Sequence, residues 1–227
     1  MRFLSVNADC FLIELDSLEE TLALYNKLHT MQLNGIKDLV PAAKTILVFF
    51  NEIETTFKTL GTSIQTVKIG SGVERNVQEL IIPICYTGED LAQVAALQGL
   101  SIADVILKHR QSVWNVAFIG FAPGFAYLGG LPDALHVSRR NSPRAPHPAN
   151  AIMIGGGMSA IASVPMPTGW WVIGRTPEKM FAPGRNPEFL VAVGDDIRFE
   201  PVNSATFTAL ETRCRNGEII ARAEAKR

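Results

Sequence analysis

The sequence predicts a two-domain α+β protein, with a ferredoxin-like α/β domain in residues 1–78 and a β-sandwich or β-barrel domain in residues 79–227. Three observations support this prediction. Strand and helix patterns alternate up to about residue 65. The polar, glycine-containing stretch 66-TVKIGSGVERNVQ-78 then indicates a domain boundary. From residue 113 onward, short apolar runs alternate with Gly and Pro, which is typical of sandwiches and barrels.

The N-terminal elements follow from local signals. Residues 2–15 end in CFLIEL and predict a strand. The stretch 17-SLEETLALYNKLHT-30 predicts a helix, because Ser17 and Glu20 have the spacing of a capping box. Residues 36–50 predict two strands around a turn at Pro41, and residues 51–65 a helix capped by Asn51 and ended by glycine. A final strand near 77–85 would complete the split βαβ pattern.

The C-terminal elements begin with a strand at 80-LIIPICY-86. Two helices are predicted next, one ending at Gly99 and one starting at the cap Ser101 with Asp104 in its first turn. Six later apolar runs predict strands: 113–121, 151–156, 160–165, 170–175, 189–193 and 196–202. The tail 221–227 is expected to fray.

Composition excludes several classes of protein. An apolar content of 47% with 19% charged residues is that of a globular chain rather than a disordered one. No apolar run approaches the ~20 residues of a membrane-spanning helix, and the N-terminus does not resemble a signal peptide, so a cytoplasmic protein is predicted. The three cysteines are far apart and the histidines do not cluster, so neither a disulfide nor a metal site is expected.

Charge is unevenly distributed along a chain whose net charge is only −1. Residues 105–177, called the basic segment below, contain 6 Lys and Arg against a single acid, Asp133. Its loop 138-SRRNSPRAPHPAN-150 carries three arginines without a local acid, which favours binding of a carboxylate or phosphate. The alternative is that these arginines pair with distant acids such as Asp195 and Asp196. His136 and His147 in the same segment are either structural or acid–base groups.

Two motifs in the basic segment are open to more than one interpretation. The run 155-GGGMSA-160 has the spacing of a dinucleotide fingerprint, but no helix is predicted after it, so the dinucleotide-binding interpretation of this run is rejected. The stretch 120-GFAPGFAYLGGLP-132 combines turn residues with aromatic rings and is either a packed corner or the wall of a site. The segment has no basic helix, so no nucleic-acid partner is expected. Aromatics in the predicted loops favour a protein partner.

Several runs together resemble the KipI/PxpB family, also called allophanate hydrolase subunit 1. They are 83-PICYTGEDLAQVAALQGLSIADVILKH-109, 118-FIGFAPGFAYLGGLP-132, 139-RRNSPR-144, 169-GWWVIGRTPEKMF-181 and 194-GDDIRFEPV-202. The resemblance implies a ferredoxin-like domain followed by a cyclophilin-like β-barrel. It also implies the PxpB-type subunit of an ATP-dependent 5-oxoprolinase, which opens 5-oxo-L-proline to L-glutamate together with KipA/PxpC-type and PxpA-type subunits.

The resemblance further implies that this chain is inactive alone and binds no cofactor, the ATP being used by the assembled complex. Two alternatives stay open: a KipI-type inhibitor of a histidine kinase, and a carboxyltransferase component acting on urea or allophanate-type amides. No catalytic residue and no metal ligand can be assigned. Matching positions expected to line one groove for a small amide or lactam are Phe121, Pro123, Gly124, Phe125, Tyr127, Arg140, Arg144, Gly174, Arg175, Thr176 and His109.

The chain departs from the family pattern in two places. Relatives usually carry Val-Pro-x-Gly-Ser where this chain has 147-HPANA-151, and Ser-Pro-Gly-Gly-Trp where it has 166-MPTGW-170. Loss of two turn glycines restricts the backbone angles available there.

Overall fold

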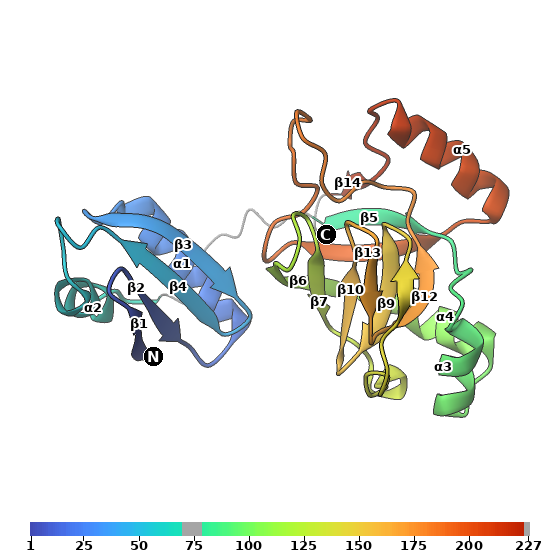
Figure 1. Cartoon of the computed structure of the whole chain (residues 1–227), viewed down its shortest axis with the longest axis horizontal. Coiled ribbons are helices and arrows are strands. Elements are labelled where there is room, and N and C mark those ends of the chain that lie inside the picture. The colour runs from blue at the N-terminus through green and yellow to red at the C-terminus, as the bar shows by residue number, and fades with distance from the viewer. Residues whose placement is uncertain (70–78, 225–227) are drawn as a thin grey trace. The chain divides into compact units, whose positions relative to one another are not determined.

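The computed structural model describes residues 1–69 and 79–224 and forms two compact units, Met1–Asn76 and Val77–Arg227 (Figure 1). These are called unit 1 and unit 2. The boundary predicted between residues 78 and 79 adjoins the segment 70–78, which lies outside the described residues, so that boundary stays a prediction. The molecule is a mixed α/β protein with extended sheets in both units.

Unit 1 is an antiparallel four-stranded sheet in the order β1-β2-β4-β3, packed against two helices. Buried residues alternate along the central strands, so one face of the sheet and the two helices enclose the core. The elements are β1 (Arg2–Asn7), β2 (Cys10–Glu14), α1 (Leu18–Met31), β3 (Ile36–Ala42), β4 (Thr45–Phe50) and α2 (Phe57–Gln65).

Local signals in unit 1 were right for α1 and less accurate elsewhere. The Ser17 side chain accepts a hydrogen bond from the Glu20 amide, which confirms the predicted cap. Helix α2 is capped by Thr56 rather than Asn51 and runs past Gly61 to Gln65. Pro41 lies within β3, because an edge strand tolerates a residue without an amide proton, and the turn follows it.

The strand predicted near 77–85 does not complete the sheet of unit 1. That strand, β5 (Glu79–Ile84), pairs with β13 and β14 in unit 2. The edge of unit 1 beside β2 is instead occupied by β1, which forms a hairpin with β2.

Unit 2 contains one eight-stranded sheet, one two-stranded ribbon and three α-helices. In Figure 1, α3 and α4 lie at one end of this unit and α5 at the other. After β5 the elements are α3 (Leu91–Gln98), α4 (Ile102–Gln111), β6 (Trp114–Ile119), β7 (Ala126–Gly129), the short helix η1 (Asp133–Leu135), β8 (Arg144–His147), β9 (Ala151–Gly155), β10 (Met158–Ile161), β11 (Met166–Thr168), β12 (Trp171–Arg175), β13 (Asp196–Pro201), α5 (Ser204–Arg215) and β14 (Arg222–Glu224).

The large sheet has the order β12-β9-β10-β7-β6-β13-β5-β14 and curls so that residues 85–90, which follow β5, lie along β12. The Cys85 and Arg175 backbones exchange two hydrogen bonds, and the amides of Gly88 and Asp90 donate to carbonyls of β12. Residues 85–90 are irregular, so within the described ranges no strand ladder closes the sheet into the predicted barrel.

Strands β7, β10, β9 and β12 bury side chains on both faces. Alternate residues enter the main core with α3 and α4, while the others form a second cluster around Phe125, Met153, Trp170 and Val172. Trp171, the first residue of β12, therefore faces the main core, whereas Trp170, which immediately precedes the strand, faces the second cluster.

Three predictions for unit 2 were wrong. Residues 204–215, for which no helix was predicted, form α5 with Asn203 as its cap. The run 189–193 is irregular, although Leu190 and Val191 enter the core. Residues 222–224 of the tail, which was expected to fray, form β14 and pair with β5. Among the described residues no single helix is long and apolar enough to cross a membrane; α3 and α4 reach that length and composition only as a pair bent by 94°.

Candidate functional site

A buried carboxylate, Asp90, forms ion pairs with two arginines of the basic segment at the start of α3. The Arg140 guanidinium lies 3.2 Å from Oδ1 of Asp90, and that of Arg144 lies 2.5 Å from Oδ2. Arg144 also reaches Glu89 at 2.9 Å, and the Val172 amide of β12 donates to Oδ2 of Asp90 at 2.7 Å. Asp90 precedes the first residue of α3 without capping it, because its carboxylate is used by these partners.

The loop before β8 places consecutive arginines against Trp170, which precedes β12, and Trp171, its first residue. Arg139 lies 5.2 Å from the centre of the Trp170 ring, and Arg140 lies 4.7 Å from that of Trp171. The Arg140 amide donates to the Gly169 carbonyl, which fixes the loop to this strand. The two cation–π contacts therefore form on opposite faces of the sheet edge.

A cavity of about 600 Å³ opens between the end of α3 and this loop. Its lining contains no carboxylate and consists of Leu97, Gln98, His136, Val137, Ser138, Arg139, Arg140, Asn141, Ser142 and Trp171. The volume lies within the range of small-molecule sites. Guanidinium, imidazole, amide and hydroxyl groups around one opening suit an anionic ligand.

Arg139 is the guanidinium most available to such a ligand. It forms no ion pair with any described residue, whereas Arg140 and Arg144 both contact Asp90. The sequence indicated Arg139, Arg140 and Arg144 as anion-binding candidates, and the groove predicted from the family resemblance included only the last two. The carboxylates that pair with Arg140 and Arg144 are distant in sequence, so the local pattern did not show that these two are already occupied. Their partners are Glu89 and Asp90 rather than Asp195 and Asp196.

The stretch between β6 and β7 displays an exposed aromatic ring. Phe121 is 75% exposed and has a φ of +75°, a conformation that bulky L-residues rarely adopt. Its ring continues into a contiguous aromatic cluster, because Phe121 contacts Phe125, and Tyr127 contacts Phe118, Phe125 and Trp170. We call these five residues, Phe118, Phe121, Phe125, Tyr127 and Trp170, the aromatic surface. Phe121 is its exposed ring, Phe118 and Tyr127 are half-buried, and Phe125 and Trp170 are buried beneath them. Pro123 is exposed in the same loop.

The glycine at position 124 has a packing role. Its φ is +73°, and a Cβ there would lie 2.7 Å from the Cβ of Phe181. The loop is therefore a tightly packed corner at Gly124 and an exposed aromatic tip at Phe121, so both sequence interpretations apply to different residues of it.

Arg175 and Thr176 lie at the other end of β12. The Arg175 guanidinium is 3.5 Å from Glu211 and 5.3 Å from the centre of the Phe207 ring, both on α5. Thr176 is fully buried, and its hydroxyl accepts a hydrogen bond from the Glu178 amide. Gly174 packs against the Cys85 carbonyl, where a Cβ would lie at 2.7 Å. These residues hold α5 and residues 85–90 in place.

His109 is enclosed in the main core of unit 2. Its ring stacks on Phe199 with centroids 4.9 Å apart, and its Nδ1 is 2.8 Å from the Tyr86 hydroxyl. Complete burial lowers the pKa of His109 from 6.5 to about 3, so the ring is neutral. Burial also raises the pKa of Tyr86.

His109 should make the protein sensitive to acid. Its pKa is lower in the folded state than in the unfolded state, so its contribution is complete above pH 6.5 and is lost as the pH falls towards 3. Each pH unit in this range removes up to about 1.4 kcal/mol. We expect His109→Gln to flatten the dependence of the unfolding free energy on pH between 6.5 and 4.5, measured by denaturant titration. His136→Gln is the matched control, and an unchanged slope in His109→Gln would contradict the assignment.

The two departures from the family pattern meet in the ribbon of β8 and β11. His147 pairs with Met166 in this ribbon. His147 is 1% exposed, and its Nδ1 donates to the Pro148 carbonyl at 2.7 Å. His147 is thus a packed ribbon residue, and the two altered segments are structural neighbours.

Within the described residues, the predicted site residues are distributed over several places rather than brought together in one groove. The arginines 140 and 144 lie beside Asp90, the aromatics form a separate surface, Arg175 and Thr176 face α5, and His109 is in the core. Their role in substrate binding stays a prediction. Across residues 1–69 and 79–224, no group of three or more His, Cys, Asp or Glu side chains is arranged to hold a metal.

Comparison with known proteins gives concordant results. Residues 1–191 match the family model described as carboxyltransferase domain, subdomain C and D. The chain is 31% identical over 190 residues to a 5-oxoprolinase subunit, the B component, of Bacillus subtilis (strain 168), covering 77% of this chain and 79% of that protein.

Solved structures give the same result for the fold. The crystal structure of TTHA0988 is similar with a TM-score of 0.78 and 28% identity over 87% of this chain, which spans only 41% of that longer one. The Kluyveromyces lactis urea carboxylase is similar with a TM-score of 0.77 at 17% identity, covering 98% of this chain and 23% of that one, a likeness of fold.

Proposed function

The chain belongs to the carboxyltransferase-domain family, subdomains C and D, and from this membership we propose that it is the B component of a 5-oxoprolinase complex. The complex would open 5-oxo-L-proline to L-glutamate at the expense of ATP, in the cytoplasm and with partner subunits. The observation that carries the proposal is the similarity to the corresponding 5-oxoprolinase subunit of Bacillus subtilis across most of both chains.

The carboxylate-free cavity beside α3 supports a role in substrate binding. 5-Oxoproline is a small anion with a planar lactam, so a guanidinium and an aromatic face are suitable groups to bind it. Arg139, turned from its position over the Trp170 ring towards the cavity, would hold the substrate carboxylate together with Ser138 and Asn141. Asp90 would keep Arg140 and Trp171 in position behind it.

The fold supports a finer assignment of the two units. Unit 1 would be a ferredoxin-like domain in which β1 takes the edge position of the final strand. Unit 2 would be a cyclophilin-like barrel whose last gap is spanned by residues 85–90 rather than by a strand.

The aromatic surface is suited to a partner subunit of the KipA/PxpC type. Exposed aromatic rings are common anchors of protein interfaces. The TTHA0988 chain is more than twice as long as this one, which supports a second protein segment packing on this fold. The strained backbone at Phe121 supports the same interpretation. A strained backbone and an exposed apolar ring both cost stability, so their combination is expected where the ring contacts a partner.

Phe121→Gly should affect stability and assembly in opposite directions. Glycine adopts a φ of +75° without steric cost, so the unfolding free energy of the isolated chain should stay level or rise by up to about 1 kcal/mol. Loss of the ring should weaken binding to the partner subunit at least about tenfold. Thermal unfolding and biolayer interferometry measure the two effects. Leu107→Ala removes an exposed apolar side chain of α4 as the control, and unaltered binding by Phe121→Gly would disprove the interface.

The function is tested by mixing the chain with candidate partner subunits and measuring 5-oxoproline-dependent ATP hydrolysis and glutamate formation. Arg139→Met should raise the KM for 5-oxoproline about tenfold to hundredfold, because a charge-assisted hydrogen bond is lost. Loss of the cation–π contact with Trp170 should lower the unfolding free energy by only about 1 kcal/mol. Arg110→Met, a loss of charge elsewhere in the basic segment, should leave KM unchanged. Absence of turnover with every partner would refute the 5-oxoprolinase function. An unchanged KM in Arg139→Met would refute the role of Arg139 in substrate binding.

The two alternative functions predict other outcomes. A KipI-type inhibitor would bind a histidine kinase and show no turnover. A carboxyltransferase component would act on urea or a related amide only with a biotin carrier. The same partner mixtures, supplied with urea and a carboxybiotin donor, separate these cases.

A further inference from the structure

The loop between α1 and β3 contains one of the two Asn-Gly dipeptides of the sequence. These are Asn34–Gly35 and Asn216–Gly217. In such a dipeptide the backbone nitrogen of the glycine can attack the side-chain amide carbon of the asparagine, because the glycine has no side chain to hinder the approach. Both dipeptides consist of the same two residues, so a difference in their reactivity would come from the fold.

Asn34 and Gly35 are the two central residues of a type II turn. The Ile36 amide donates to the Leu33 carbonyl at 3.2 Å, and Gly35 has a φ of +82°, the value that this turn requires at its third position. The Gly35 carbonyl accepts a hydrogen bond from the Asn51 amide at 2.7 Å. The turn is therefore fixed on both sides of its central peptide group.

The central peptide group itself is not held by a hydrogen bond. Within the described part of the chain, the Asn34 carbonyl accepts none and the Gly35 amide donates none. This group can rotate about its two flanking Cα atoms without breaking a backbone hydrogen bond. Such a rotation leaves both Cα atoms in place and brings the Gly35 nitrogen towards the Asn34 side chain.

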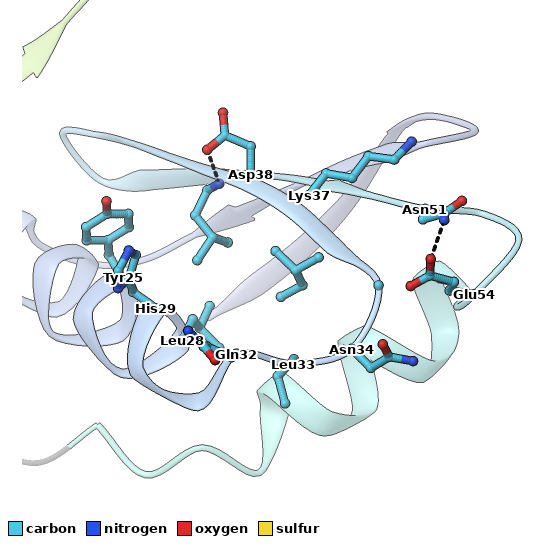
Figure 2. Close-up of a pocket in the computed structure, with 13 residues that line it drawn as sticks. Tyr25, Leu28, His29, Gln32, Leu33, Asn34, Lys37, Asp38, Asn51 and Glu54 are labelled. Atoms are coloured by element: carbon cyan, nitrogen blue, oxygen red, sulfur yellow. Dashed lines mark hydrogen bonds between the residues drawn. The ribbon is translucent and has the colours of Figure 1, made fainter.

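Asn34 is also accessible to water. It is exposed and lies on the loop that borders a pocket of unit 1, between the end of α1, the edge strand β3 and the turn before α2 (Figure 2). The pocket has a volume of about 640 Å³. Water can therefore reach the side-chain amide, and a small leaving group can diffuse away from it.

Asn216–Gly217 is equally exposed, but its backbone is held. It ends α5, and the Gly217 amide donates to the Cys214 carbonyl at 3.1 Å. The following amide, that of Glu218, donates to the Arg213 carbonyl at 3.2 Å, which is typical of a helix end. The nitrogen that would attack is thus engaged in a hydrogen bond, and this bond must break before Asn216 can react.

We propose that Asn34 is a site of spontaneous deamidation in the native protein. The Gly35 nitrogen gives its proton to water and forms a bond to Cγ of Asn34, which closes a succinimide ring. The bond between Cγ and the side-chain nitrogen breaks, and that nitrogen takes up a proton and leaves as ammonia. Water then adds to one of the two ring carbonyls and opens the ring to aspartate or isoaspartate. The net reaction consumes one water and releases one ammonia.

Isoaspartate at position 34 should disturb the connection between α1 and β3. The main chain then runs through the side-chain carbon and is one atom longer, directly before the Gly35 carbonyl that binds the Asn51 amide. Gly35 packs closely here, because a Cβ on it would lie 2.6 Å from Cγ2 of Thr55. A longer main chain cannot keep both contacts, so unit 1 should lose stability as the protein ages.

The test is peptide mapping of the full chain after incubation in a mildly alkaline buffer. The tryptic peptides 28–37 and 216–222 report the two sites separately by the mass increase of deamidation. We expect Asn34 to react roughly fivefold or more faster than Asn216 in the native protein, because only Asn216 must first break a backbone hydrogen bond. In guanidinium chloride at the same pH the two rates should converge, since neither turn is then formed.

Asn34→Gln is the matched control, because it keeps the amide but places its carbon one bond further from the Gly35 nitrogen. Its peptide 28–37 should stay unmodified while Asn216 reacts as in the parent chain. After ageing in parallel, the parent chain should begin to unfold at a lower temperature than Asn34→Gln. The proposal is overturned if Asn216 reacts as fast as Asn34 in the native protein, if the difference persists in denaturant, or if the aged parent chain and Asn34→Gln unfold alike.

Discussion

Asp90→Ala is expected to lower the unfolding free energy of unit 2 by about 3–5 kcal/mol. The carboxylate is 2% exposed and compensates two largely buried guanidinium groups, so its removal leaves uncompensated positive charge in the interior. It also removes the acceptor of the Val172 amide, which lies in β12. The midpoint of thermal unfolding should fall by roughly 6–20 °C in a domain of this size.

Glu89→Gln is the matched control for this prediction. Glu89 pairs with the same Arg144, but its side chain is 55% exposed, so the loss should be below about 1 kcal/mol. Asp90→Asn should lie between the two, because the amide oxygen still accepts from Val172 while the charge is lost. If Asp90→Ala were as stable as Glu89→Gln, the carboxylate would not be the centre of this cluster.

Sequence was informative wherever a signal acts within a few residues. Ser101 caps α4 as predicted and also forms a capping box with Asp104, and Gly99 ends α3 in the left-handed conformation that its position requires. Short apolar runs bounded by Gly and Pro placed most strands of unit 2. These features depend on the backbone geometry of one turn or one strand.

The candidate site depends on contacts between distant segments, which is why it was predicted only in part. Arg140 and Arg144 are separated from Asp90 by 50 and 54 residues, and nothing near the arginines indicates that partner. Helix α5 was missed for a related reason. It buries only Cys214, so it lacks the apolar periodicity that identifies a helix.

Glu178→Ala is the second substitution with a large expected effect, again about 3–5 kcal/mol. Glu178 is fully buried and accepts hydrogen bonds from the amides of Ile220 and Ala221 at 2.5 and 2.8 Å, while Arg185 lies 3.3 Å away. The thiol of Cys214 on α5 lies 3.7 Å from the same carboxylate, and burial together with this charge raises the thiol pKa to about 11. The Glu178 side chain thus contacts both α5 and the residues that lead into β14 and stabilises their positions.

Because Glu178 contacts α5 and the residues before β14, Glu178→Ala should destabilise these elements before it destabilises the rest of unit 2. Hydrogen exchange of residues 204–224 should accelerate in Glu178→Ala more than that of β9 and β10, because those strands keep their own pairing and core contacts. Residues 204–224 should exchange more slowly in Glu178→Gln than in Glu178→Ala, since the amide oxygen at the position of Oε2 still accepts from both backbone amides. Glu188→Ala, an exposed carboxylate of the same loop, should alter neither quantity by more than about 1 kcal/mol. Uniform acceleration across unit 2 would mean that Glu178 supports the whole sheet rather than its C-terminal covering.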